Sequence, residues 1–321
     1  MTPGSTKPPK GVIAIEEAVL NPAGLAWINE TAPLNQATQT PSPPSSPEHR
    51  LNELLLDIHH HRLEEMDAHG VEFMLLSLAS PGAQGESDPE KARTLASEAN
   101  DWLAAEVAQN TNRFGALASV SMHNIEEAVA EVTRAVKELG MYGVMVNDYQ
   151  AFEGGRKLYD TAEYRPFWKA IEELDVPVYM HPRYPPARDL VPGTVLGDRR
   201  HILGAAMQFD LSMHLIPFNL WRADHWYNKL VKRDTRPSKE DYSYYFTTNI
   251  SITTSGNFNT QALKYCVDYI GPERCLFSID YPYDTMAEAQ WWWFTVDLPE
   301  DQKQLVAREN AIRLFKLPLE I

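Results

Sequence analysis

Residues that can bind a metal ion or move a proton stand at the ends of several apolar runs of this sequence. Glu16 and Glu17 lie late in the run GVIAIEEAV, and His181 ends the run VPVYMH. Asn147 ends YGVMVN, and Asp280 follows CLFSI. Carboxylate oxygen and imidazole nitrogen are donors that Zn²⁺, Mg²⁺ and Mn²⁺ accept in proteins. The sequence therefore predicts a site for one divalent metal, provided that the fold brings these run ends together.

Each of these residues also has a structural interpretation. A histidine before a proline, as His181 is, is often held only by local hydrogen bonds, and an aspartate at a strand end often caps the next helix. One such residue alone does not establish a ligand. Several of them on one rim of a sheet favour a metal site.

The apolar pattern predicts the elements that would position these residues. Runs that are apolar on both faces are typical of parallel strands covered by helices, and they occur at 11–19, 71–79, 113–120, 142–147, 176–182, 249–256 and 275–282. Helix starts are predicted at Asp88-Pro89, an N-cap followed by proline, and at Asn124 with Glu127, a capping box. Further helices are expected at 164–174, from about Asn259, and in ENAIRLFKL.

This alternation favours a closed parallel barrel of the TIM type over an open doubly wound sheet. Such barrels carry eight strands in about 250 residues, with the active site at the carboxyl ends of the strands. An open sheet usually has a glycine-rich phosphate turn after its first strand, and IEEAVLNPAG is not one. The seven runs leave one strand missing, between His181 and Ile250.

Composition limits the class of protein further. The 321 residues suffice for one large domain, which we expect at 11–321 after a disordered extension at 1–10 and with a flexible loop at about 35–50. The net charge of −15 argues against nucleic acid or an anionic membrane as a partner. The two cysteines, Cys266 and Cys275, suit buried thiols in a reducing compartment, and we expect a cytoplasmic protein.

Several conspicuous stretches have an unremarkable interpretation. A helix is expected from about Leu51 to Gly70, with His59, His60 and His61 inside it and solvated. The three tryptophans at 291–293 cannot all face one core, so one or two should pack on the barrel and another stay partly exposed or meet a neighbouring subunit.

Eight stretches together resemble the metal-dependent aromatic acid decarboxylases of the amidohydrolase superfamily, among which fungal 2,3-dihydroxybenzoate and bacterial γ-resorcylate decarboxylases are most similar. They are IAIEEA, MDAHGVEFMLLSLASPGAQ, RFGALASVSMHN, YRPFWKAIEELDVPVYMHPRYP, WRADHW, ITTSGNF, LFSIDYPY and RENAIRLFKL. The resemblance runs from about Gly11 to Leu317. It implies a TIM barrel, one divalent metal (Zn²⁺, Mg²⁺ or Mn²⁺), a small aromatic acid substrate and a homodimer or homotetramer.

The resemblance also implies roles for single residues. Glu16, His181 and Asp280 match the metal ligands, and Asp280 also matches the acid that protonates the ring carbon bearing the carboxylate. Ala18 stands where some members have the histidine of Glu-x-His. Together with Asn147 and Arg222, it is expected on the substrate side. Arg222, in WRADHW, matches an arginine that reaches a neighbouring subunit's substrate in some relatives.

The sequence departs from the family near LSMHLIPFNLWRADHW (211–226), which reads as one long amphipathic helix. The family's Gly-His-(Met/Leu)-Gly-Glu segment at the end of strand six is absent, and its flanks join directly at His214–Leu215. We therefore expect one deleted βα unit and impaired turnover. Three explanations stay open: a gene-model or splice artefact, an inactive paralogue that serves as a scaffold subunit, and a rearranged working barrel. A hydrolase of the same superfamily is a further alternative.

Overall fold

The computed structural model describes residues 11–35, 46–183, 216–229, 235 and 238–321. All seven predicted strands occur, several of them shorter than expected. In chain order they are β1 (Val12–Val19), β2 (Val71–Leu78), β3 (Phe114–Ala116), β4 (Val144–Asn147), β7 (Val178–His181), β8 (Ile252–Thr253) and β9 (Cys275–Leu276). A two-stranded antiparallel hairpin, β5 (Gln150–Phe152) and β6 (Gly155–Lys157), follows β4 and was not predicted.

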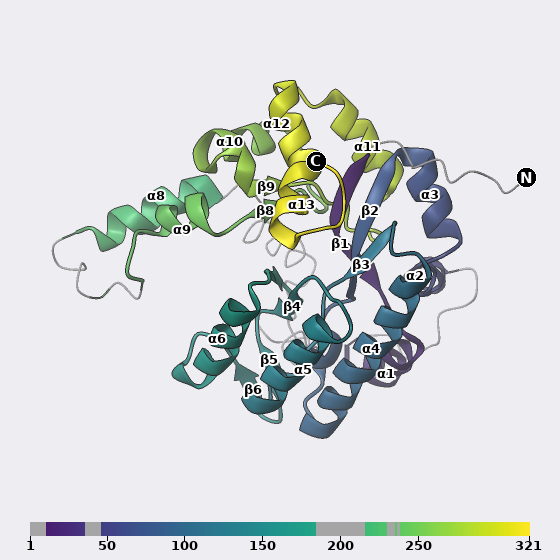
Figure 1. Ribbon diagram of the computed structural model, residues 1–321. Coiled ribbons are helices and arrows are strands. Elements are labelled where there is room, and N and C mark those ends of the chain that lie inside the picture. The colour runs from purple at the N-terminus through teal and green to yellow at the C-terminus, as the bar shows by residue number, and fades with distance from the viewer. Residues whose placement is uncertain (1–10, 36–45, 184–215, 230–234, 236–237) are drawn as a thin grey trace, which may run out of the picture.

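The parallel strands follow one another around a ring (Figure 1). β1 pairs with β2 and β2 with β3, a bridge from Ala118 to Val144 leads to β4, and β4 pairs with β7. On the other side of β1, the Ala18 N–H donates to the Tyr281 carbonyl at 2.8 Å, which places the segment after β9 against β1. β9 in turn pairs with β8. The carboxyl ends of all these strands therefore meet at one rim.

Among the described strands, β7 and β8 have the fewest contacts that connect them across the ring. Within the described residues no backbone ladder joins these two strands, and a hydrogen bond of 3.3 Å between the hydroxyls of Tyr179 and Thr253 links them. The expected junction at His214–Leu215 lies outside the described residues, as does the first part of the helix predicted over 211–226. The described helix there is α8 (Ile216–Tyr227).

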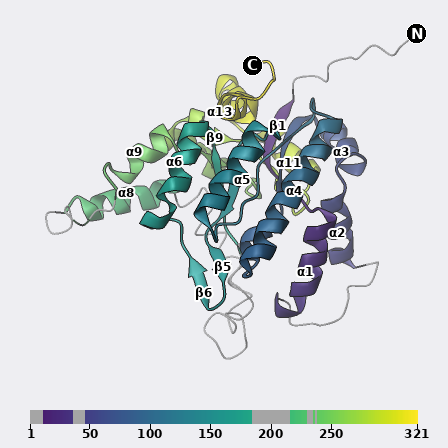
Figure 2. The same ribbon diagram turned by 60° about the horizontal axis from the view of Figure 1, so that its bottom comes forward.

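Helices surround the ring and begin where capping residues stand. They are α1 (Pro22–Asn35), α2 (Pro47–Leu56), α3 (His61–His69), α4 (Pro89–Gln109), α5 (Ile125–Lys137), α6 (Arg165–Leu174), α8, α9 (Tyr242–Thr248), α10 (Thr260–Ile270), α11 (Met286–Thr295), α12 (Glu300–Gln304) and α13 (Asn310–Phe315). The predicted caps are confirmed: the Asp88 carboxylate accepts from Lys91 N, and the Asn124 side chain accepts from Glu126 N and Glu127 N. α8 and α9 project away from the ring, while the β5–β6 hairpin extends from its lower edge in Figure 2.

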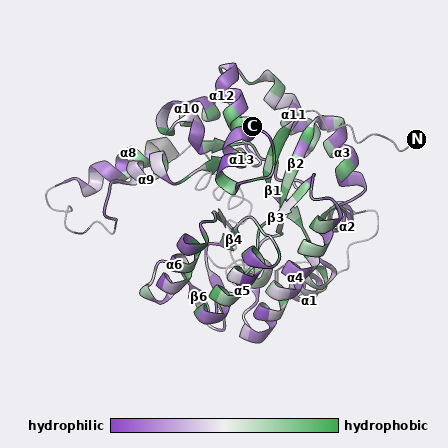
Figure 3. Ribbon diagram, viewed as in Figure 1, coloured by the Kyte–Doolittle hydropathy of each residue, from purple (hydrophilic) through white to green (hydrophobic). Residues whose placement is uncertain are grey.

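Alternate residues of β1 serve two separate cores. Ile13 and Ile15 pack with Phe73 inside the ring, where Phe315 of α13 joins them, whereas Val12 and Ala14 belong to the larger core beneath the outer helices. This is the period-two pattern of a barrel strand. Because Ile13 and Phe73 lie early in their strands, α13 covers the amino end of the ring. Figure 3 shows the hydrophobic strands at the centre, with helices of mixed character outside.

The helix predicted from Leu51 to Gly70 is interrupted, and this part of the prediction was wrong. The Asp57 carboxylate accepts from His60 N at 3.2 Å and from Arg62 N at 2.9 Å, which ends α2 and starts α3. The buried Arg62 side chain donates to the Asp57 carbonyl, a group that an unbroken helix would have used itself. His59 was expected to be solvated, but it lies 2.9 Å from Glu106 and is half-buried.

Some of the remaining predictions are confirmed, and two helices were missed or misplaced. Cys266 and Cys275 are free and buried, as predicted. Trp292 and Trp293 are buried and Trp291 is exposed, as expected for that run. α1 was not predicted, although Asn21-Pro22 repeats the capping signal of Asp88-Pro89. α2 already begins at Pro47, inside the stretch expected to be a loop, while 36–45 lie outside the described residues. In the described part of the chain, no helix is both long and apolar enough to cross a bilayer.

Candidate active site

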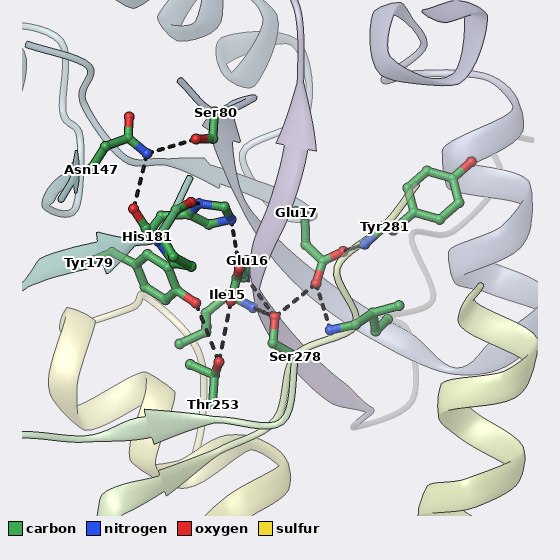
Figure 4. A network of polar contacts seen from close by, with 12 residues as sticks. Ile15, Glu16, Glu17, Ser80, Asn147, Tyr179, His181, Thr253, Ser278 and Tyr281 are labelled. Carbon is green, nitrogen blue, oxygen red and sulfur yellow. Dashed lines mark hydrogen bonds and ion pairs between the residues drawn. The ribbon is translucent and has the colours of Figure 1, made fainter. Parts of the chain in front are cut away.

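The structure brings Glu16 and His181 into direct contact at the carboxyl-end rim (Figure 4). Glu16 Oε1 lies 3.1 Å from His181 Nε2, and the two side chains are 12% and 24% exposed. The residues come from β1 and β7, which are not neighbours in the ring, so both side chains must reach into its interior. The predicted convergence of this carboxylate and this imidazole is therefore present.

Contacts on both sides of the imidazole fix the orientation of His181. Its Nδ1 is bonded to the carbonyl of Pro182, and its own carbonyl accepts from the Asn147 side chain at 3.1 Å. The Asn147 amide also donates to Ser80 Oγ at 2.8 Å. Burial lowers the pKa of His181, but the hydrogen bond and the charge of Glu16 outweigh it, so the pKa lies above its ordinary value. Asn147 was expected to face the substrate, and in this structure its amide holds the histidine segment.

Two hydroxyls that were not predicted complete the surroundings of Glu16. Thr253 Oγ1 donates to Glu16 Oε2 at 3.3 Å, and the Tyr179 hydroxyl lies 3.3 Å from the same Thr253 oxygen. Thr253 ends β8 in the stretch ITTSG, and Tyr179 precedes His181 by two residues on β7. The sequence offered one sign that Thr253 and Tyr179 belong to the site, namely their position near a strand end. Hydroxyl residues are common at such positions, so this sign alone could not identify them.

Asp280 follows β9 with its backbone in the left-handed region, at φ 76°. Burial and the neighbouring charge of Glu16 raise the pKa of its carboxyl to about 8, with His181 opposing the shift and Asp284 adding to it. An aspartate in this region is uncommon and is kept there by its surroundings. Asp280 therefore holds a proton near neutral pH when no cation is bound.

Glu17, the neighbour of Glu16, is fully buried in a second cluster. Its carboxylate accepts from Ser278 Oγ at 3.1 Å, Ile279 N at 3.1 Å and Tyr281 N at 3.0 Å. Burial raises the pKa of Glu17 to about 8, against the lowering effect of these backbone N–H groups and of Arg62. The sequence marked Glu17 as polar at a strand end but gave no sign of this role.

The other predicted site residues lie apart from this contact. Ala18 is buried, and its carbonyl accepts from Arg62 Nη2 at 2.8 Å. Arg222 is exposed on α8, which extends away from the ring (Figure 1). Among the described residues, no group of three or more His, Cys, Asp or Glu side chains is placed so that it could hold a metal ion. Glu16 and His181 instead bond each other.

Comparison with known proteins identifies the class. The family model described as amidohydrolase (Amidohydro_2) matches residues 56–317, so the chain belongs to this family. The chain is 39% identical to γ-resorcylate decarboxylase of Rhizobium radiobacter over 294 residues, covering 83% of this chain and 90% of that protein. It is 30% identical to the decarboxylase orsB of Emericella nidulans, with 81% and 86% of the two chains covered.

A solved structure agrees with these relatives. The crystal structure of 2,6-dihydroxybenzoate decarboxylase from Rhizobium superposes with a TM-score of 0.82 at 33% identity, covering 96% of this chain and 99% of that one. A dihydroxybenzoic acid decarboxylase from Polaromonas sp. JS666, solved with manganese and 2-nitroresorcinol, gives a TM-score of 0.81 at 32% identity, with 97% and 98% covered. These relatives support the amidohydrolase-like barrel expected from the alternating strands and helices.

Proposed function

We propose that this protein is a metal-dependent carboxy-lyase that removes the carboxylate of a hydroxybenzoate without oxidation. One observation carries the proposal: Glu16 and His181 meet at the carboxyl-end rim, beside an Asp280 whose pKa the charge of Glu16 helps to raise. The relatives named above supply the reaction class, and the Polaromonas protein supplies the precedent for manganese.

The donor chemistry of the rim fits a divalent cation. Glu16 and His181 are in contact, and burial together with the charge of Glu16 shifts Asp280 toward its protonated form. Glu16, His181 and Asp280 would be the ligands. A bound cation would stabilise the negative charge of the substrate carboxylate and its ortho hydroxyl.

The residues of the chain would do the rest of the chemistry. Asp280 would deliver its proton to the ring carbon that bears the carboxylate, after which carbon dioxide leaves as the ring regains aromaticity. General acid catalysis of this kind contributes roughly 10²–10⁴-fold. Asn147 would keep His181 in place through its carbonyl, and Thr253 would keep Glu16 in place through its second oxygen. We propose a 2,3- or 2,6-dihydroxybenzoate as substrate.

We also propose that the ring lacks the strand six of its relatives, which would leave β7 and β8 as neighbours linked through Tyr179 and Thr253. The hydrogen bond of 3.3 Å between the hydroxyls of these two residues brings β7 and β8 close together and supports this idea. Turnover should then be lower than in the relatives, because the histidine and glutamate of the missing segment would not assist Asp280. A catalytically impaired scaffold subunit is the alternative.

The protein is further proposed to form a homodimer or homotetramer. α8 and α9 carry the exposed side chains Trp221, Trp226 and Tyr244 away from the ring. Helices that project in this way and expose aromatic side chains are suited to contact a second subunit. Arg222 lies on the same arm.

Incubation of the purified protein with 2,3- and 2,6-dihydroxybenzoate tests the function. Each substrate is supplied with Mn²⁺, Mg²⁺ or Zn²⁺, and carbon dioxide release is followed together with catechol or resorcinol formation. We expect product with at least one metal and none after chelation. Product formation that Asp280→Asn leaves unchanged would refute the assigned acid. Stable folded protein with neither product nor metal uptake would favour the scaffold.

A further inference from the structure

β1 departs from regular pairing with β2 between Ala14 and Glu17. It advances three residues, from Ala14 to Glu17, while β2 advances two, from Met74 to Leu76. Such a bulge leaves backbone groups unpaired and redirects side chains. In Figure 4, Glu16 points toward His181 and Glu17 toward Tyr281.

The side chain of Ser278 compensates for the bulge. Its Oγ accepts from Glu16 N at 2.8 Å and from Ile15 N at 3.3 Å, and it donates to Glu17 Oε1 at 3.1 Å. One buried hydroxyl therefore fixes the backbone of Glu16 and joins it to the carboxylate of Glu17. A buried N–H left without such a partner would destabilise the folded chain.

The carboxylate of Glu17 continues this connection to the segment that carries Asp280. It accepts from the N–H of Ile279 and of Tyr281, the residues on either side of Asp280. Asp280 itself has a left-handed backbone that an aspartate rarely adopts. Bonds to both flanking peptide groups restrain such a conformation.

Arg62 completes the cluster from the side of α3. It is fully buried, donates to the Ala18 carbonyl at 2.8 Å, and lies over the Tyr281 ring at 4.7 Å. It therefore contacts β1 just after Glu17 and the segment just after Asp280.

We propose that Glu17, with Ser278 and Arg62, is a positioning residue that holds Glu16 and Asp280 in the relative placement required to share one cation. We call these three residues the Glu17 clamp. None of the described hydrogen bonds or ion pairs of the three involves His181, so the clamp acts through the backbone of Glu16 and Asp280. The proposal depends on the proposed metal-dependent function for its effect on affinity, whereas its effect on the conformation of Asp280 does not.

Three single variants test the clamp. Glu17→Gln keeps the shape of the side chain but replaces one accepting oxygen with an NH₂ group, which then faces a donor instead of accepting from it. Ser278→Ala removes only the hydroxyl. Glu72→Gln is the matched control. Glu72 is also a largely buried carboxylate on a neighbouring strand, bonded to a backbone N–H and an arginine, but it lies at the amino end.

Mn²⁺ binding is measured by electron paramagnetic resonance, and metal-free crystal structures are determined. We expect Glu17→Gln and Ser278→Ala to weaken Mn²⁺ binding by roughly 10–100-fold, with Asp280 leaving the left-handed region, while Glu72→Gln binds within about twofold of wild type. If Glu17→Gln does not fold, Ser278→Ala decides.

Wild-type affinity in the clamp variants, or an unchanged Asp280 backbone and Glu16–His181 contact in their metal-free structures, would overturn the proposal. If the wild-type protein binds no Mn²⁺, the proposed function fails, and the metal-free structures alone decide the clamp.

Discussion

Buried carboxylates occur at both ends of the ring, and their partners differ. At the amino end, Glu72 accepts from Gly11 N at 2.8 Å and from Arg308 Nη2 at 3.0 Å. Nearby, Arg113 pairs with Asp67 at 2.6 Å. At the carboxyl end, Glu16 contacts His181, the charges of both act on Asp280, and the described ion pairs give neither carboxylate an arginine or lysine.

The difference shows what each end is built for. A carboxylate paired with arginine and a backbone N–H is satisfied within the chain and stabilises the fold. A carboxyl whose pKa is raised by burial and by a neighbouring carboxylate, as that of Asp280 is by burial and by Glu16, gains stability when a cation enters. Chemistry at the carboxyl ends of strands and stability at the amino ends is the usual division in parallel barrels.

The largest effect is expected from Asp280→Asn. The variant removes the proton donor while keeping the size of the side chain, so turnover should fall by roughly 10²-fold or more. Product formation is measured at saturating substrate and metal. Circular dichroism should show an intact fold. A variant that retains full turnover would contradict the assignment of the chemistry to the carboxyl end of the ring.

At the amino end, Arg308→Met should affect folding instead. It leaves Glu72 nearly buried without its cation, which typically costs about 3–5 kcal/mol. Urea unfolding measures the loss. Mn²⁺ affinity of the protein that remains folded should equal that of wild type, and a weaker affinity would show that the two ends are coupled.

The metal-free protein should lose stability as pH rises from about 4 to about 8. Burial is the largest cause that raises the pKa of both Glu17 and Asp280 to about 8. A folded-state pKa above the ordinary value of about 4 makes the stabilising contribution complete at low pH, and it is lost as pH rises through 8.

Urea midpoints between pH 5.5 and 8.5, with a chelator present, test this dependence. Asp280→Asn should flatten the profile, and saturating Mn²⁺ should restore stability at the upper end. At 100 times its dissociation constant, a ligand adds about 2.7 kcal/mol. A wild-type profile as flat as that of Asp280→Asn would exclude the proposed pKa of Asp280.

The smallest effect should come from an exposed pair that belongs to neither end. Lys264 and Asp297 lie 3.2 Å apart, with 45% and 90% of their side chains exposed. Solvent screens such pairs, so Lys264→Met should change the free energy of unfolding by less than about 1 kcal/mol. If Lys264→Met loses more unfolding free energy than this, the loss expected for Arg308→Met could not be assigned to the burial of the Glu72 carboxylate.

Local chemistry determined much of the fold in advance. The seven apolar runs became strands, and Asp88 and Asn124 cap their helices as predicted. These features depend on neighbours within a few residues, so one sequence suffices to find them. The same local reasoning placed Glu16, His181 and Asp280 at strand ends, and the alternation of strands and helices implied a common rim.

Only the tertiary structure decided how those strand ends are joined. At the break between α2 and α3, Arg62 bonds the carbonyls of Asp57 and Leu54, which a continuous helix would have used itself. The bulge in β1, the serine that satisfies it and the carboxylate of Glu17 that binds both peptides around Asp280 connect residues about 260 positions apart. Hydrogen bonds of such long range follow from the closure of the ring, and no pattern within a short stretch of sequence can encode them.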